Sequence, residues 1–177
     1  SAEQTGFLYA LAEGAEIVVR LDGDGQHPAT EARRVVSILE SSGADVVIGS
    51  RFLDGAGYLS TPLRRWGIRW LSLLLRILGD IRVSDPTSGL RAFRRTAFGL
   101  MAQVYPSGYP EPESNLLLAR AGLRVIETPV RMRSRGAGRS SLEGLASLYY
   151  PLKVTFALLV EALRRPVVPD RDASGEV

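Results

Sequence analysis

The feature that most constrains this chain is a short apolar segment that ends in two carboxylates. Residues 17–21 are rich in β-branched side chains, and Asp22 and Asp24 follow them, each with a glycine directly after it. A strand that ends this way delivers two acidic side chains to the rim of a sheet, where they repel each other unless a cation neutralises them. Hard divalent cations such as Mg²⁺ and Mn²⁺ take such oxygen ligands readily. The motif therefore predicts either a metal site or a polar turn built from Asp and Gly.

A third interpretation, a calcium-binding EF-hand loop, fails on the residues that follow. Counted from Asp22, the sixth position is His27, where that loop needs Gly, and the twelfth is Arg33, where it needs Glu. The remaining alternatives are therefore the polar turn and the metal site, and the rest of the chain favours the metal site.

The composition narrows the chemistry further. The chain has 177 residues, enough for one domain with a real core, and it has no cysteine, which excludes disulfides, zinc-thiolate sites and thiol nucleophiles. His27 is the one histidine, and no nucleophile-elbow motif accompanies it. Nearly all of the cations are Arg, whose planar fork suits phosphate groups. No apolar run approaches the roughly 20 residues that a membrane-spanning helix needs.

The apolar periodicity predicts alternating helices and strands. We expect helices at 3–13, 28–42, 61–79, 114–121 and 141–165 (the last interrupted at Pro151), a short helix from Thr96, and strands at 16–21, 44–48, 123–132 and after the turn that begins at 85. A strand, a helix and a strand within about 30 residues form a βαβ unit, which favours a parallel sheet. Ligands of such sheets bind beyond the carboxyl ends of the strands, so Asp22, Asp24 and Arg51 should converge there.

Two loops carry further charged side chains. The loop 107–113 contains Glu111 and Glu113, which either complement a helix N-terminus or, for Glu113, act as a base toward a hydroxyl acceptor. Asp85 either caps a turn or orients an Arg. The second loop, 131–140, is rich in Arg.

Segments 61–79 and 141–165 combine Trp or Tyr with Arg or Lys and with aliphatic residues. They are either helices packed on the core or helices that lie at a membrane surface.

The order of these motifs resembles that of family 2 glycosyltransferases with the GT-A fold, and most closely the dolichyl- or polyprenyl-phosphate sugar transferases. The stretches that carry the resemblance are 4–7, 22–28, 47–51, 85–93 and 133–141. It implies an α/β fold with a mostly parallel, Rossmann-like sheet flanked by helices. The family normally begins with two further strands that hold the nucleotide. Residues 1–165 therefore resemble the carboxyl-terminal two thirds of the domain, incomplete at its amino-terminal side, and 166–177 should be a polar, disordered tail.

The resemblance also implies a function. It predicts a metal-dependent, inverting transferase that moves a hexose from a nucleotide-sugar to a polyprenyl phosphate. Asp22, Asp24 and Gln26 would hold Mg²⁺ or Mn²⁺, and the catalytic residues would be Asp24, Arg51 and Glu113. The substrate would be bound by Asp22, Arg51, Asp85, Arg91, Arg133, Arg139 and Ser140. The expected partners are the donor, the lipid acceptor and a membrane surface, with no nucleic acid, and the expected location is the cytoplasm, peripherally on the cytoplasmic membrane.

Two alternatives remain open at this point. The acceptor could be a saccharide hydroxyl, or the chain could be a non-catalytic fragment or pseudoenzyme that serves as an interaction module. If strand 16–21 lacks a neighbour from before Ser1, its free edge invites pairing with another chain. We therefore expect the 177 residues alone to be inactive as a transferase and to dimerise or aggregate through this edge.

Overall fold

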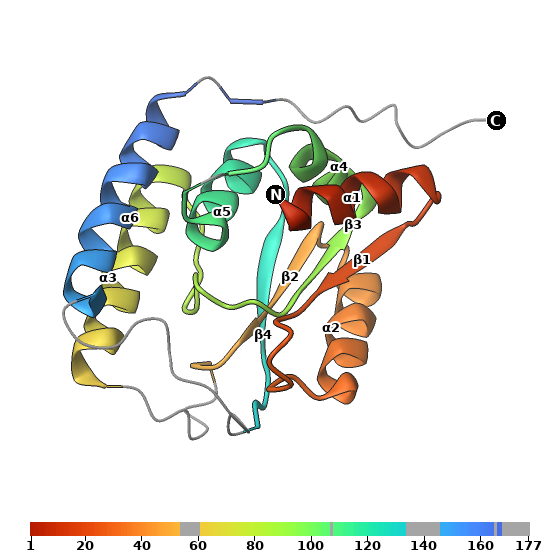
Figure 1. Cartoon of the computed structure of the whole chain (residues 1–177), viewed down its shortest axis with the longest axis horizontal. Helices are drawn as coiled ribbons and strands as arrows, with labels where there is room; N and C mark the ends of the chain where they lie inside the picture. The colour runs from red at the N-terminus through yellow and green to blue at the C-terminus, as the bar shows by residue number, and fades with distance from the viewer. Residues whose placement is uncertain (54–60, 107, 134–145, 165, 168–177) are drawn as a thin grey trace.

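The computed structural model describes residues 1–53, 61–106, 108–133, 146–164 and 166–167 (Figure 1). Its helices are α1 (Ala2–Ala12), α2 (Ala29–Ser42), α3 (Pro62–Gly79), α4 (Arg95–Gln103), α5 (Pro110–Arg120) and α6 (Ala146–Leu163). Its strands are β1 (Ile17–Arg20), β2 (Val46–Ser50), β3 (Arg91–Arg94) and β4 (Val125–Pro129).

The described strands form one sheet in the order β1-β3-β2-β4. β3 runs antiparallel to both of its neighbours, whereas β2 and β4 are parallel. Three strands therefore point in one direction and β3 in the other, and the sheet is mixed, with two antiparallel pairings and one parallel pairing. The expected α/β fold, with a sheet flanked by helices, is confirmed. β1, α2 and β2 form the expected strand–helix–strand unit, but the two strands are not neighbours, because β3 lies between them.

Side chains alternate across this sheet and so build a core on each face. Val47 of β2 packs with Val35 and Leu39 of α2 on one face. Val46 and Ile48 point to the opposite face and belong to the larger cluster, which the other helices cover (Figure 1). Because β1, β2 and β4 run in the same direction, their carboxyl ends lie at the same edge of the sheet.

Helices α3 and α6 lie side by side on the larger core (Figure 1). Contrary to the sequence expectation, α6 runs through Pro151 without interruption. The pyrrolidine ring faces Gly67 of α3, where a Cβ would lie 2.8 Å from Pro151 Cγ, so glycine makes the notch that accepts it. A hydrogen bond from Trp70 Nε1 to Thr155 Oγ1, 2.9 Å long, also joins the two helices. No helix within the described ranges is long and apolar enough to cross a membrane.

The start of α5 also differs from the expectation. We expected 107–113 to be a loop, but the helix begins at Pro110, whose fixed φ is already helical and whose missing N–H costs nothing at a first helical position. Glu111 and Glu113 consequently lie in the first turn of α5. At the other side of the sheet, the outer edge of β1 pairs with no strand among the described residues. Association through that edge stays a prediction.

Candidate functional site

The acidic motif forms a tight turn directly after β1. Gly25 has a φ of +73°, a left-handed conformation that suits glycine, and Asp24 Oδ1 accepts a hydrogen bond from the backbone N–H of Gln26 at 3.0 Å. Gln26 Nε2 donates to the carbonyl of Arg133 at 3.2 Å, and Arg133 N–H donates to the carbonyl of Gln26 at 2.9 Å. These bonds attach the chain beyond β4 to the acidic motif, so the structure brings Gln26 and Arg133 together.

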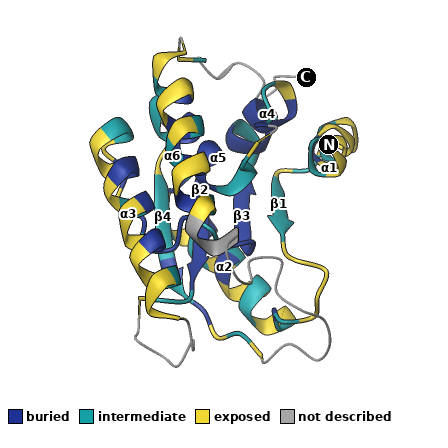
Figure 2. Cartoon of the chain, turned by 60° about the vertical axis from the view of Figure 1, so that its left-hand side comes forward, coloured by how far each residue is buried: buried dark blue, intermediate teal, exposed yellow. Residues whose placement is uncertain are grey.

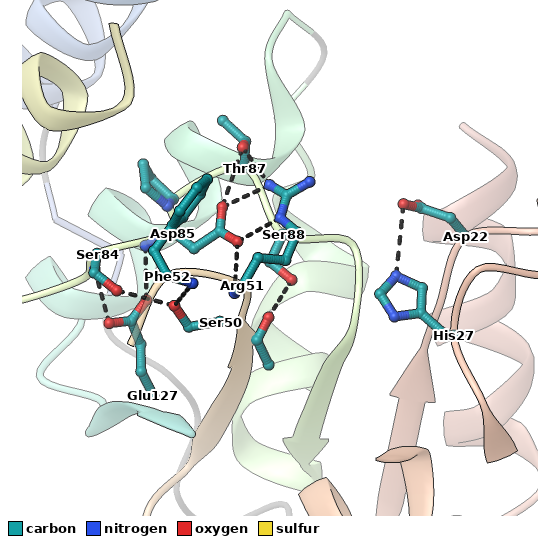
Figure 3. A network of polar contacts seen from close by, with 12 residues as sticks. Asp22, His27, Ser50, Arg51, Phe52, Ser84, Asp85, Thr87, Ser88 and Glu127 are labelled. Atoms are coloured by element: carbon teal, nitrogen blue, oxygen red, sulfur yellow. Dashed lines mark hydrogen bonds and ion pairs between the residues drawn. The ribbon is translucent and has the colours of Figure 1, made fainter. Parts of the chain in front are cut away.

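Asp22 lies against the segment that leads into β3. A Cβ on Gly89 would overlap the Asp22 carboxylate, so this approach requires glycine at position 89. The Asp22 side chain is 49% exposed, and its Oδ2 lies 4.0 Å from Nε2 of His27 (Figure 3). Both ring nitrogens of His27 are buried and have no hydrogen-bond partner. Burial lowers the pKa of His27 more than the charges of Asp22 and Asp24 raise it, so the ring is neutral and packs at the start of α2.

Arg51, the residue after β2, pairs with Asp85 through two parallel hydrogen bonds. Nε donates to Oδ2 and Nη2 to Oδ1, both at 2.6 Å, and the backbone N–H of Arg51 donates to Oδ2 at 3.1 Å (Figure 3). Nη2 also donates to Thr87 Oγ1 at 2.9 Å. The Asp85 side chain is fully buried and that of Arg51 nearly so. Of the two interpretations of Asp85, the structure favours the one in which it orients an Arg.

Residues 84–90, which we call the connecting segment, lead from α3 into β3. Hydrogen bonds hold this segment against β2 and β4. Ser84 Oγ and Ser50 Oγ share a 2.9 Å hydrogen bond, and Ser88 Oγ donates to the carbonyl of Gly49 at 2.5 Å. Glu127 of β4 accepts the backbone N–H groups of Ser84 and Asp85. The sequence analysis missed Glu127. A signal was present, since acidic residues are depleted in strands and Glu127 lies in the middle of a short one.

Arg91, which we expected to bind substrate, is fully buried. Its guanidinium N–H groups donate five hydrogen bonds to acceptors inside the protein: the carbonyls of Ser88, Pro86 and Glu111, Ser114 Oγ and Asn115 Oδ1. Burial, and after it the charge of Arg20, lowers the pKa of Arg91 to about 10. Arg91 thus joins β3, the connecting segment and α5, and no N–H group is left for a ligand. A role in substrate binding is not supported by this geometry.

The two glutamates at the start of α5 both have structural partners. Glu111 pairs with Arg20 at the end of β1, and Arg20 Nη2 also lies 2.8 Å from Glu3 Oε1. Glu113 is buried, and its Oε1 accepts the backbone N–H of Tyr109, which lies just before the helix. This favours the interpretation that the glutamates complete the helix N-terminus. Catalysis by Glu113 stays a prediction.

Two predicted substrate-binding residues, Arg139 and Ser140, lie outside the described residues. Within the described ranges, no three His, Asp or Glu side chains converge closely enough to hold a metal ion by themselves. The acidic motif contributes two carboxylates and one amide, all three of them oxygen donors. This set suits Mg²⁺ or Mn²⁺ when a ligand supplies further oxygens.

The acidic motif and Arg133, the last residue described directly after β4, thus meet at the carboxyl ends of strands in an α/β sheet. Residues 1–100 match the model of glycosyl transferase family 2. That match covers more than half of the chain, so the chain belongs to this family.

Relatives of known function agree with this assignment. An undecaprenyl-phosphate mannosyltransferase of Micrococcus luteus is 31% identical over 143 residues, covering 78% of this chain and 58% of that protein. A polyprenol monophosphomannose synthase of Mycolicibacterium smegmatis is 29% identical over 148 residues, covering 81% of this chain and 56% of that protein. The chain therefore spans about half the length of the curated relatives it matches.

The fold has a counterpart among solved structures. The crystal structure of glucosyl-3-phosphoglycerate synthase from Mycobacterium tuberculosis, in complex with phosphoglyceric acid, matches with a TM-score of 0.58 and 21% sequence identity. The match covers 96% of this chain and 56% of that one. It establishes the GT-A fold of the chain.

Proposed function

We propose that this chain carries the metal-binding and acceptor-binding part of a hexosyltransferase that moves a sugar from a nucleotide-sugar to a polyprenyl phosphate. The contact between Gln26 and Arg133 carries the proposal, because it sets an acidic motif suited to a metal–diphosphate beside an Arg suited to a second phosphate. The relatives from Micrococcus luteus and Mycolicibacterium smegmatis, an undecaprenyl-phosphate mannosyltransferase and a polyprenol monophosphomannose synthase, support the same class of acceptor.

Asp22, Asp24 and Gln26 are the residues that would hold Mg²⁺ or Mn²⁺. These residues suit such an ion because all three offer oxygen donors. Gly89 has no side chain and so leaves space for the Asp22 carboxylate at the edge of the sheet. Gln26 donates its side-chain N–H to Arg133, so its amide oxygen is the atom available as a ligand. When bound, the metal would neutralise the diphosphate and make the nucleotide a better leaving group.

The acceptor needs positioning more than it needs a base. The oxygen of a lipid phosphate is already anionic at neutral pH, so displacement at the anomeric carbon requires cations that hold it against the donor. Arg51 and Arg133 are the proposed cations. Asp85 holds Arg51 in a fixed orientation, which lowers the entropy cost of presenting it to an anion. We also propose that the acceptor oxygen displaces the nucleotide directly, which inverts the configuration at the anomeric carbon.

A lipid acceptor also requires contact with a bilayer, and α3 and α6 offer the surface for it. Figure 2 shows exposed positions along both helices. Large apolar side chains occupy exposed positions at spacings of three and four residues: Trp66, Trp70, Leu73 and Ile77 on α3, and Tyr149, Leu152, Phe156, Leu159 and Leu163 on α6. We name these residues the apolar face. Arg65, Arg69 and Arg76 are exposed along one side of it. Apolar side chains flanked by cations suit the headgroup region of a membrane, so we propose peripheral association with the cytoplasmic membrane.

The test is product analysis with the complete natural protein. Supplied with Mn²⁺, a panel of nucleotide-sugars and a short-chain polyprenyl phosphate, it should yield a lipid-linked hexose with inverted anomeric configuration. Formation of product only with a sugar acceptor would favour transfer to a hydroxyl. No metal-dependent binding of a nucleoside diphosphate, together with no transfer, would favour the non-catalytic alternative.

A further inference from the structure

Glu127 holds two successive peptide groups, one with each of its carboxylate oxygens. It lies on β4, opposite Ile48 of β2, and is partly buried. Oε2 accepts the N–H of Ser84 at 2.7 Å and Oε1 accepts the N–H of Asp85 at 2.8 Å. A carboxylate that accepts two successive N–H groups fixes both the position and the orientation of the backbone between them, and charged acceptors make such bonds strong.

The backbone held by Glu127 is the one that carries Asp85. Asp85 in turn receives three hydrogen bonds from Arg51, two from the guanidinium and one from the backbone. A continuous series of contacts therefore runs from β4 through the connecting segment to the end of β2 (Figure 3). A bidentate pair tolerates little displacement, so a shift of the Ser84–Asp85 peptide reaches the Arg51 guanidinium.

We infer that Glu127 is a positioning residue, which sets the orientation of Arg51 through the backbone of Ser84 and Asp85 without touching a ligand itself. The effect on Arg51 stands on the contacts alone. The consequence for acceptor binding rests on the proposed function.

The competing explanation is that Glu127 only stabilises the fold. The two explanations differ in where the effect of a substitution appears. Substitution of a purely stabilising residue lowers the free energy of unfolding and leaves Arg51 unchanged in the folded state. Substitution of a positioning residue changes Arg51 in the folded state as well.

Glu127→Gln is the informative variant, because the amide keeps one acceptor oxygen and turns an NH₂ group toward the other backbone N–H. In isotope-labelled protein without ligand, solvent exchange of the Arg51 Nε proton should become about tenfold faster, as expected when one charge-assisted hydrogen bond is lost. Exchange of the Ser84 and Asp85 amides should accelerate with it. Glu13→Gln, at an exposed site after α1, is the matched control and should change none of these rates.

Leu158→Ala controls for stability, since Leu158 is fully buried on α6 and its apolar side chain can make no hydrogen bond to this network. It should lower the melting temperature at least as much as Glu127→Gln while leaving the Arg51 Nε proton unchanged. Equal exchange of that proton in wild type and Glu127→Gln would overturn the inference. So would equal acceleration in Leu158→Ala.

Kinetics of the complete protein provide the second readout. Glu127→Gln should raise KM for the polyprenyl phosphate about tenfold and leave KM for the nucleotide-sugar unchanged. In an Asp85→Asn background the same substitution should add little, because its path to Arg51 is already broken. Full additivity would overturn the inference. If the wild type transfers no sugar, the proposed function fails, whereas the exchange measurement still decides the role of Glu127.

Discussion

Gln26 and Arg133 are 107 positions apart in the sequence and are joined by two hydrogen bonds, one from the side chain of Gln26 and one from the backbone of Arg133. The first fixes the rotamer of a proposed metal ligand. The second fixes the start of the Arg-rich loop at the same place. Changes on either side of this contact should therefore affect both the metal and the acceptor.

Asp24→Asn should abolish metal binding and sugar transfer while leaving the fold intact, because an amide supplies no charge to offset that of a divalent cation. Isothermal titration with Mn²⁺, in the presence of a nucleoside diphosphate, measures the first effect, and turnover measures the second. Asp80→Asn, at the exposed end of α3, is the control and should leave both unchanged. Normal turnover of Asp24→Asn, or of the wild type in excess chelator, would rule out the metal site.

Gly89→Ala should weaken Mn²⁺ binding, since the new methyl group would displace the Asp22 carboxylate. The matched control is Gly6→Ala in α1, where a Cβ meets nothing within 4 Å. That control should keep its metal affinity and gain up to about 1 kcal/mol of stability from the better helix propensity of Ala. Unchanged Mn²⁺ affinity in Gly89→Ala would show that Asp22 does not bind the metal.

Arg51→Lys and Arg133→Lys should each weaken use of the acceptor more than binding of the donor. Lys at position 51 cannot keep the bidentate pair with Asp85 that orients the cation, and Lys at position 133 replaces a planar fork by a point charge. KM for each substrate measures the difference, and Arg34→Lys on the exposed side of α2 serves as control. A matching loss of donor affinity would instead assign these two residues to the donor diphosphate.

The apolar face should bind the chain to anionic liposomes. Trp66→Ser combined with Phe156→Ser removes two large exposed side chains and should reduce co-sedimentation severalfold, whereas Tyr9→Ser, exposed on α1, should not. Binding should also fall as salt rises, because the flanking Arg residues act through screened charge. Absence of binding at low salt would leave α3 and α6 as ordinary packing helices.

Stability should fall in acid through Glu111. Burial alone would raise the pKa of Glu111, but the charge of Arg20 and its hydrogen bond, with the charge of Arg91, lower it below 4.5. A carboxyl with a lowered pKa in the folded state stabilises the protein above pH 4.5, and this contribution is lost as the pH falls through the folded pKa. The stability difference between wild type and Glu111→Gln should therefore shrink as pH falls below about 4.5. Chemical denaturation across pH measures it, and a constant difference would contradict it.

Local patterns in the sequence predict most elements here, because helices and strands depend on nearby residues. The acidic turn and the helical start of residues 29–42 follow from such patterns. For Asp85 the sequence leaves two roles open, and its partner Arg51 is 34 positions away. The insertion of β3 between β1 and β2 does not, because strand order is decided by tertiary packing.

Arg91 and Glu127 show a second limit of the sequence. In the sequence, Arg91 follows a polar stretch and looks like an Arg that binds phosphate. Only the structure shows that all of its N–H groups donate to acceptors inside the protein. Glu127 resembles a solvent-facing residue of a strand, and its two acceptor bonds involve residues more than 40 positions away.

The position of β3 has a consequence for how the molecule assembles during synthesis. β1 and β2 emerge from the ribosome before β3, yet they have no hydrogen bonds to each other and wait for residues 91–94 to join them. β4, which pairs with β2, emerges later still. Because non-local pairing is slow and must first overcome the entropy of closing long loops, the acidic motif gains these neighbours late. A nascent chain that stops before residue 91 would leave the β3-facing edges of β1 and β2 unpaired, which makes this interval the one in which a chaperone is most needed.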